Sequence, residues 1–87
     1  MAMRPWSFIE GIVMDKDILD VQSLGKVVRE TRKYQGLTQD DLAGMTGTGR
    51  RFISELEKGK ATAQIGKVLL VLSVLGIALY ALSKWKE

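Results

Sequence analysis

Two short segments of helical pattern lie near the middle of the chain, and a glycine-bearing turn separates them. Thr38 is followed three residues later by Asp41, an acidic form of the capping box that starts a helix. A second segment covers about residues 49–57, and Gly47 between the two suits a left-handed turn. Two helices of about eight residues joined by so short a turn have the layout of a helix-turn-helix, although many small helical bundles share that spacing.

Helical signals continue on both sides of this pair. Ser23 is a candidate N-cap for a first helix that Gly36 ends, and Thr62 for a fourth helix over about residues 63–75 that Gly76 ends. The apolar residues expected inside are Leu24, Val27, Val28, Leu42, Ala43, Met45, Ile53 and Leu56. The pattern predicts an all-α domain over residues 24–76, flanked by an N-terminal extension (1–23) and a C-terminal segment (77–87).

Composition removes several classes of function. The chain of 87 residues has no cysteine and no histidine, which removes disulfide scaffolds, zinc sites, thiol nucleophiles and imidazole general bases together. We therefore expect no enzyme activity, no metal and no cofactor. The net charge of +3 permits an anionic partner without requiring one. A core this small also favours association with a second copy or a partner.

The central residues carry a family resemblance. Residues 37–43 (LTQDDLA), Gly47 and residues 53–60 (ISELEKGK) closely resemble the XRE family, which includes the lambda-type phage repressors, and the likeness spans about residues 24–75. Residues 49–63 and 65–69 are most similar to the HipB-type antitoxins of that family. The resemblance implies a compact lambda-repressor-like domain of four to five helices in a cytoplasmic, nucleoid-associated bacterial protein. It also implies a HipA-like serine/threonine kinase toxin as partner and repression of a shared operon.

The start of the second central helix has the chemistry of DNA reading. In helix-turn-helix proteins the N-terminal end of this helix enters the major groove. Its adjacent arginines point about 100° apart, so one can take a bidentate pose on guanine while the other reaches a flanking base or phosphate. Matched to the family motif, the base-reading positions are Gly49, Arg50, Arg51 and Ser54. The alternative is a solvated arginine pair on a surface helix.

Other residues are expected to contact the DNA backbone or to support the fold. The predicted backbone contacts are Thr38, Gln39, Thr48, Lys58 and Lys60, with a solvated loop as the alternative for the two lysines. Arg32 and Glu57 match family positions that form a partly buried ion pair. Phe52 either touches a thymine methyl group or packs against the helix that Thr38 starts, and packing is favoured.

Residues 68–82 form an apolar run without a charge. As one helix the run would be about 22 Å long, short of the about 30 Å hydrocarbon core of a membrane. We expect its first half, with Leu69 and Leu72, to complete the core, and residues 77–82 to form a strand that pairs with a second subunit. The predicted dimerisation residues are Leu69, Leu72, Ile77, Leu79, Tyr80 and Leu82. A helical tail and a peripheral membrane anchor are the alternatives.

The first residues give little functional information. Glu10 interrupts their apolar run, which makes a poor signal peptide, and Met14 is a plausible start of the compact chain. Residues 1–13 are either an upstream extension or a short arm that packs on the domain or a partner. The sequence as a whole predicts a dimeric repressor that reads a palindromic operator in double-stranded DNA. The alternative is a protein-interaction module in which DNA binding is incidental.

Overall fold

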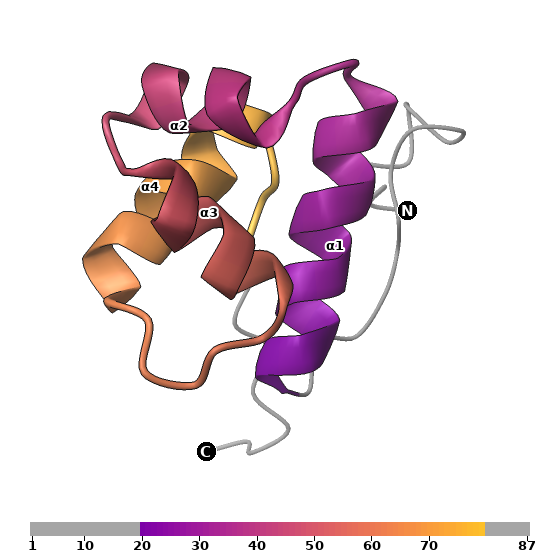
Figure 1. The fold of residues 1–87 in the computed structure, drawn as a ribbon. Helices are drawn as coiled ribbons and strands as arrows, with labels where there is room; N and C mark the ends of the chain where they lie inside the picture. Colours follow the sequence, from indigo (N-terminus) through magenta and orange to yellow (C-terminus); the bar gives the residue numbers. More distant parts are fainter. Residues whose placement is uncertain (1–19, 80–87) are drawn as a thin grey trace, which may run out of the picture.

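The computed structural model describes residues 20–79, and this part of the chain is all-α. Its helices are α1 (Val21–Tyr34), α2 (Gln39–Thr46), α3 (Arg50–Glu57) and α4 (Ile65–Leu75) (Figure 1). The predicted all-α class is confirmed. Of the expected C-terminal strand, residues 77–79 leave α4 without strand structure, while Tyr80 and Leu82 lie outside the described residues.

The first helix begins earlier than the sequence suggested. Its N-cap is Asp20, whose carboxylate accepts a hydrogen bond from the Ser23 backbone amide at 2.8 Å. This bond holds the pKa of the Asp20 carboxyl below its usual range. The expectation that Ser23 is the cap was therefore wrong, because Asp20 places it inside the first turn. Gly36, at φ 75°, takes the left-handed conformation that ends the helix as predicted.

The turn chemistry of α2 follows the sequence prediction. The Thr38 hydroxyl accepts from the Asp41 amide and the Asp41 carboxylate accepts from the Thr38 amide, each at 2.9 Å. This capping box is complete, and the bond from Thr38 lowers the pKa of Asp41. Gly47 ends α2 at φ 72°, which lets the chain turn directly into α3.

The fourth helix was predicted with the wrong start and the right end. Its N-cap is Gln64 and no side chain caps it, so Thr62 does not start this helix. In the loop before it, Gly59 lies close to Gln22 at the start of α1. Gly76 ends the helix at φ 78°, and the Gln35 side-chain amide donates to the Leu75 carbonyl at 2.8 Å, which ties this end to α1.

The core lies between α1, α2, α3 and α4. Its buried apolar residues are Val27, Val28, Leu42, Ala43, Ile53, Leu56, Val68, Val71, Leu72 and Leu75. Two expectations fail here, because Met45 is 55% exposed on the outer side of α2 and Leu69 is 45% exposed on the outer side of α4. Leu72 does complete the core, with only 2% of its surface exposed.

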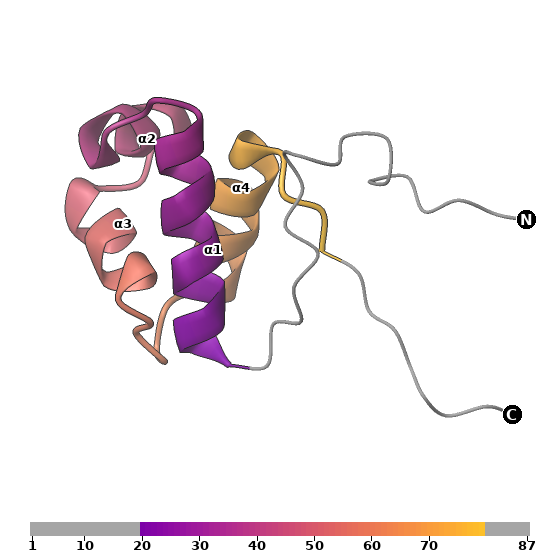
Figure 2. The ribbon, with the colours of Figure 1, turned by 90° about the vertical axis from the view of Figure 1, so that its right-hand side faces the viewer.

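The helices divide the molecule into two sides. Figure 2 shows α3 on one side of α1, with α4 and the segment that follows it on the other. The outer face of α3 and the outer face of α4 are therefore available to different partners. Within the described part of the chain, no helix is long and apolar enough to cross a membrane.

The closest contact between α1 and α3 gives a prediction about stability. A Cβ atom on Gly25 would collide with the backbone carbonyl oxygen of Leu56 and lie 2.7 Å from that of Glu57. Gly25→Ala should therefore lower the free energy of unfolding by about 1–3 kcal/mol, because neither backbone can yield without moving a helix.

Urea unfolding followed by circular dichroism measures this change. The matched control is Gly44→Ala in α2, where nothing lies within 4 Å of the added Cβ. That substitution should stabilise the protein by about 0.5–1 kcal/mol, because alanine loses less backbone entropy in a helix than glycine. Equal effects of the two substitutions would contradict the close packing of α1 on α3.

Candidate nucleic-acid interface

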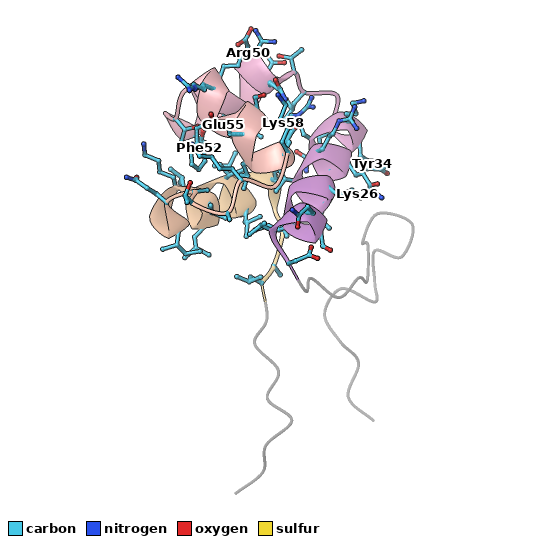
Figure 3. The ribbon with its side chains drawn as sticks, turned by 60° about the horizontal axis from the view of Figure 1, so that its bottom comes forward. Lys26, Tyr34, Arg50, Phe52, Glu55 and Lys58 are labelled. Carbon is cyan, nitrogen blue, oxygen red and sulfur yellow. The ribbon has the colours of Figure 1, made fainter. Side chains whose placement is uncertain are left out.

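One stripe of side chains covers the outer face of α3. Ile53 and Leu56 turn inward to the core, so Arg51, Ser54, Glu55 and Lys58 share the opposite face at helical spacing. Arg51 and Lys58 are exposed, and Ser54 and Glu55 are half-buried. Arg50 and Lys58 come from opposite ends of the helix (Figure 3). This polar stripe, residues 51, 54, 55 and 58, is the surface that the helix can present to a groove.

The N-terminal end of α3 is open. Gly49 precedes the helix with an extended backbone, and no side chain caps the first turn. Because Gly49 has no side chain, a ligand can approach the backbone closely here. The Arg50 Nε atom lies 3.6 Å from Asp40 Oδ1, and both side chains are mostly exposed. Such a pair is worth little in water, so Arg50 can exchange Asp40 for another acceptor.

Arg51 has a carboxylate partner that sequence reasoning missed. Its Nε donates to Glu55 Oε2 at 3.1 Å, and Lys60 Nζ donates to Glu55 Oε1 at 2.9 Å. The bond from Lys60, followed by that from Arg51, lowers the pKa of Glu55, so this carboxylate is ionised at neutral pH. The available signal was the spacing of four residues between Arg51 and Glu55, which places them together on one helix face.

A buried ion pair holds α3 in place. Arg32 donates through Nε to Glu57 Oε2 at 2.6 Å and through Nη2 to Oε1 at 3.0 Å. Only 8% of the Arg32 side chain and 4% of the Glu57 side chain are exposed. The bond to Glu57 raises the pKa of Arg32 above its already high value. Arg32 also donates to the Leu37 carbonyl at 2.8 Å, so α1 is joined to α3 and to the segment before α2.

The predicted backbone-contact residues fall into two groups. Lys58 and Lys60 are exposed at and after the end of α3, and Lys60 also pairs with Glu55 at the surface. Gln39, Thr38 and Thr48 already have partners within the fold. The Gln39 side chain donates to Glu57 Oε1 at 3.1 Å, the Thr38 hydroxyl caps α2, and the Thr48 hydroxyl lies 2.8 Å from that of Thr46. Contact of these residues with phosphate stays a prediction.

Phe52 takes part in packing. Its ring is half-buried against the core, and the Lys67 ammonium of α4 lies 5.7 Å from the ring centroid. This half-buried position agrees with packing, the favoured interpretation, and the contact with Lys67 is to α4, a helix other than the expected α2. The lysine contact adds a cation–π attraction between α3 and α4.

The fold and this surface together define a class of protein. A short helix held by its predecessor across a glycine turn, with arginines at its exposed start, is a helix-turn-helix arrangement suited to the major groove. The chain matches the family described as Helix-turn-helix over residues 28–82. It belongs to this family of DNA-binding regulators, which is not a family of enzymes, and is of the XRE type.

Individual relatives agree with this assignment. The chain is 54% identical over 66 residues to an uncharacterized HTH-type transcriptional regulator, y4mF, of Sinorhizobium fredii. The match covers 76% of this chain and 87% of that protein. The protein is therefore a helix-turn-helix transcriptional regulator.

Solved structures of the same fold include two HipB complexes. The HipB–O4 20mer complex and the HipA–HipB–O2–O3 complex each superpose with a TM-score of 0.73 at 20% sequence identity. Each comparison covers 80% of this chain and 99% of the other. The expected lambda-repressor-like, HipB-like fold is confirmed.

The buried ion pair gives a prediction about the stability of the interface. Glu57→Gln should lower the free energy of unfolding by about 3–5 kcal/mol, because it leaves the buried Arg32 charge without a counter-charge. Urea unfolding measures the loss. The control is Asp40→Asn, which removes the exposed partner of Arg50 and should leave stability almost unchanged. Equal effects of the two substitutions would show that Arg32 and Glu57 do not anchor α3.

Proposed function

We propose that the protein is a dimeric, sequence-specific DNA-binding repressor and the antitoxin of a type II toxin–antitoxin module. The observation that carries the DNA-binding part is the exposed start of α3, where Arg50 and Arg51 stand on a helix braced by Arg32 and Glu57. Bracing matters because base readout requires side chains in a defined orientation, whereas attraction to phosphate does not.

In this proposal α3 enters the major groove with its N-terminal end. Gly49 allows close approach, and Arg50, Arg51 and Ser54 read base edges. Lys58 and Lys60 neutralise phosphates at the other end of the helix. Thr38, Gln39 and Thr48 add backbone contacts through groups not used by their bonds within the fold. Base specificity therefore comes from the start of α3, and the salt dependence of binding comes mainly from the two lysines at its other end.

The antitoxin part of the proposal rests on the solved structures of the same fold. They include HipB with a DNA 20mer and HipB with HipA, which supports a HipA-like kinase toxin as the protein partner. Such an antitoxin would repress its own operon from the bacterial cytoplasm, in association with the nucleoid. We propose no catalytic activity, metal or cofactor for it.

The dimer part of the proposal concerns the side of the molecule away from α3. Leu69 and Leu79 are exposed there, and Ile77 is half-buried against the core. Leu72 lies in the core of the single subunit and supports the interface only from within, which corrects its expected role as a contact. Tyr80 and Leu82 would extend the interface and lie outside the described residues. A two-fold dimer places two α3 helices on a palindrome with half-sites about 34–36 Å apart, or a multiple of this.

Titration against the DNA upstream of its own gene tests the repressor function. The wild-type protein should bind this duplex in the presence of random competitor DNA, and its affinity should fall steeply between two salt concentrations. Alanine at Arg50 or Arg51 should weaken binding by about 1–3 kcal/mol and relax the preference at one base pair. The control, Arg29→Ala, removes an exposed arginine of α1 and should keep the base preference.

The same titration separates this function from that of a protein-interaction module. The repressor function would be contradicted if random DNA competed for the protein as well as the upstream DNA does. Unchanged affinity for the upstream DNA in both arginine variants would also contradict it. In that case the protein would use its fold to hold a protein partner, with DNA binding incidental.

Sedimentation at micromolar concentration tests the dimer. The wild-type protein should sediment as a dimer, and Leu69→Lys should dissociate it, because a charge would be buried on the apolar outer face of α4. Met45→Lys introduces the same charge at an exposed apolar position of α2 and should leave the dimer intact. A wild-type monomer at all concentrations would contradict the proposed interface.

A further inference from the structure

A single carboxylate lies within the polar stripe of α3. Glu55 is half-buried between Arg51 and Ser54 on one side and Lys58 on the other along the helix. Figure 3 shows its position on the same helix as Arg50 and Lys58. A negative charge on a surface that faces phosphates lowers affinity for any DNA, so its presence there needs a compensating role.

The geometry of the Arg51 contact indicates such a role. Arg51 donates to Glu55 through Nε at 3.1 Å, and Nη1 and Nη2 make no hydrogen bond with the part of the chain that the structure describes. Guanine presents two acceptors, O6 and N7, which match two donors of one guanidinium. Glu55 thus holds the guanidinium by its inner nitrogen and leaves the two terminal nitrogens for a base.

The second contact of Glu55 affects binding to phosphate. Its Oε1 accepts from Lys60 Nζ at 2.9 Å, so one carboxylate pairs with two of the cations nearest the proposed groove surface. Binding to DNA of any sequence depends on cations that displace counterions from phosphates. A carboxylate paired with two such cations weakens the attraction of the protein to DNA of any sequence. A guanine opposite Arg51 restores the lost affinity through its hydrogen bonds to the guanidinium.

We propose that Glu55 is a positioning residue that sets the DNA specificity of this protein, orienting Arg51 toward guanine and penalising DNA that lacks guanine there. The inference rests on the proposed function and adds to it a residue outside the predicted base-reading set. The target is a guanine in the half-site that faces Arg51.

The experiment compares the full-length wild-type protein with Glu55→Gln. Each protein selects sites from a pool of randomised duplex DNA, and its affinity for the wild-type site and for a random duplex is then measured at two salt concentrations. Glu55→Gln should bind the random duplex about threefold more tightly at low salt. The slope of log affinity against log salt concentration should steepen by about one. Its preference for guanine at one position should fall about tenfold.

Two further variants separate charge from orientation. Asp20→Asn changes the net charge by the same amount at the start of α1, and asparagine caps a helix as well as aspartate. It should keep the guanine preference. Glu55→Asp keeps the charge but has a shorter side chain, so the guanine preference should fall while affinity for random DNA stays near that of the wild type.

A double-variant cycle tests whether Glu55 acts through Arg51. In an Arg51→Lys background, which keeps the charge and removes the Nε donor, Glu55→Gln should cause no further loss of guanine preference. An unchanged selected site in Glu55→Gln, or an equal loss in the Arg51→Lys background, would overturn the inference. Failure of the wild-type protein to select any site would instead overturn the proposed repressor function.

Discussion

The buried ion pair between Arg32 and Glu57 is the interaction on which the arrangement of this small domain depends. Removing two charges from water costs more than their attraction returns unless their hydrogen-bonding capacity is also met. Here the guanidinium uses Nε and Nη2 on the carboxylate and Nη1 on the Leu37 carbonyl. The carboxylate in turn accepts from Gln39 at the start of α2. One network therefore sets the positions of α1, α2 and α3 relative to one another, and with them the direction in which the polar stripe of α3 faces.

Apart from this ion pair and Thr46, the side chains buried within residues 20–79 are apolar, and α4 supplies several of them. α4 closes the side of the domain away from α3 by burying Val68, Val71, Leu72 and Leu75. Its outer face keeps Ile65, Leu69 and Leu70 exposed. Exposed apolar groups of this kind gather where a second subunit or partner binds. The polar stripe of α3 and the apolar outer face of α4 are thus two separate surfaces of the domain. In the proposed function, the first binds DNA and the second binds another subunit.

Helix boundaries show where sequence reasoning succeeded and where it could not. The capping box of Thr38 and Asp41 was predictable because both bonds join residues three apart. Ser23 and Asp20 are equally good caps, and local chemistry could not choose between them. Thr62 does not cap α4, whose N-cap is Gln64, two residues later, without a side-chain hydrogen bond. Hydrophobicity alone predicts Met45 and Leu69 in the core, but the positions of the neighbouring helices leave both side chains exposed.

The sequence by itself determined the approximate positions of the helices within residues 20–79, the glycine turns that end them and the family to which the motif belongs. These features depend on hydrogen bonds and backbone conformations within three or four residues, and on periodicity along a single helix. Only the tertiary structure decided that Gln39 binds Glu57 and that Phe52 packs beside Lys67. Gln39 and Glu57 are 18 residues apart, and Arg32 and Glu57 are 25 apart. Such partners meet only after the core has packed, because the packing of the helices fixes which side chains come within hydrogen-bonding distance.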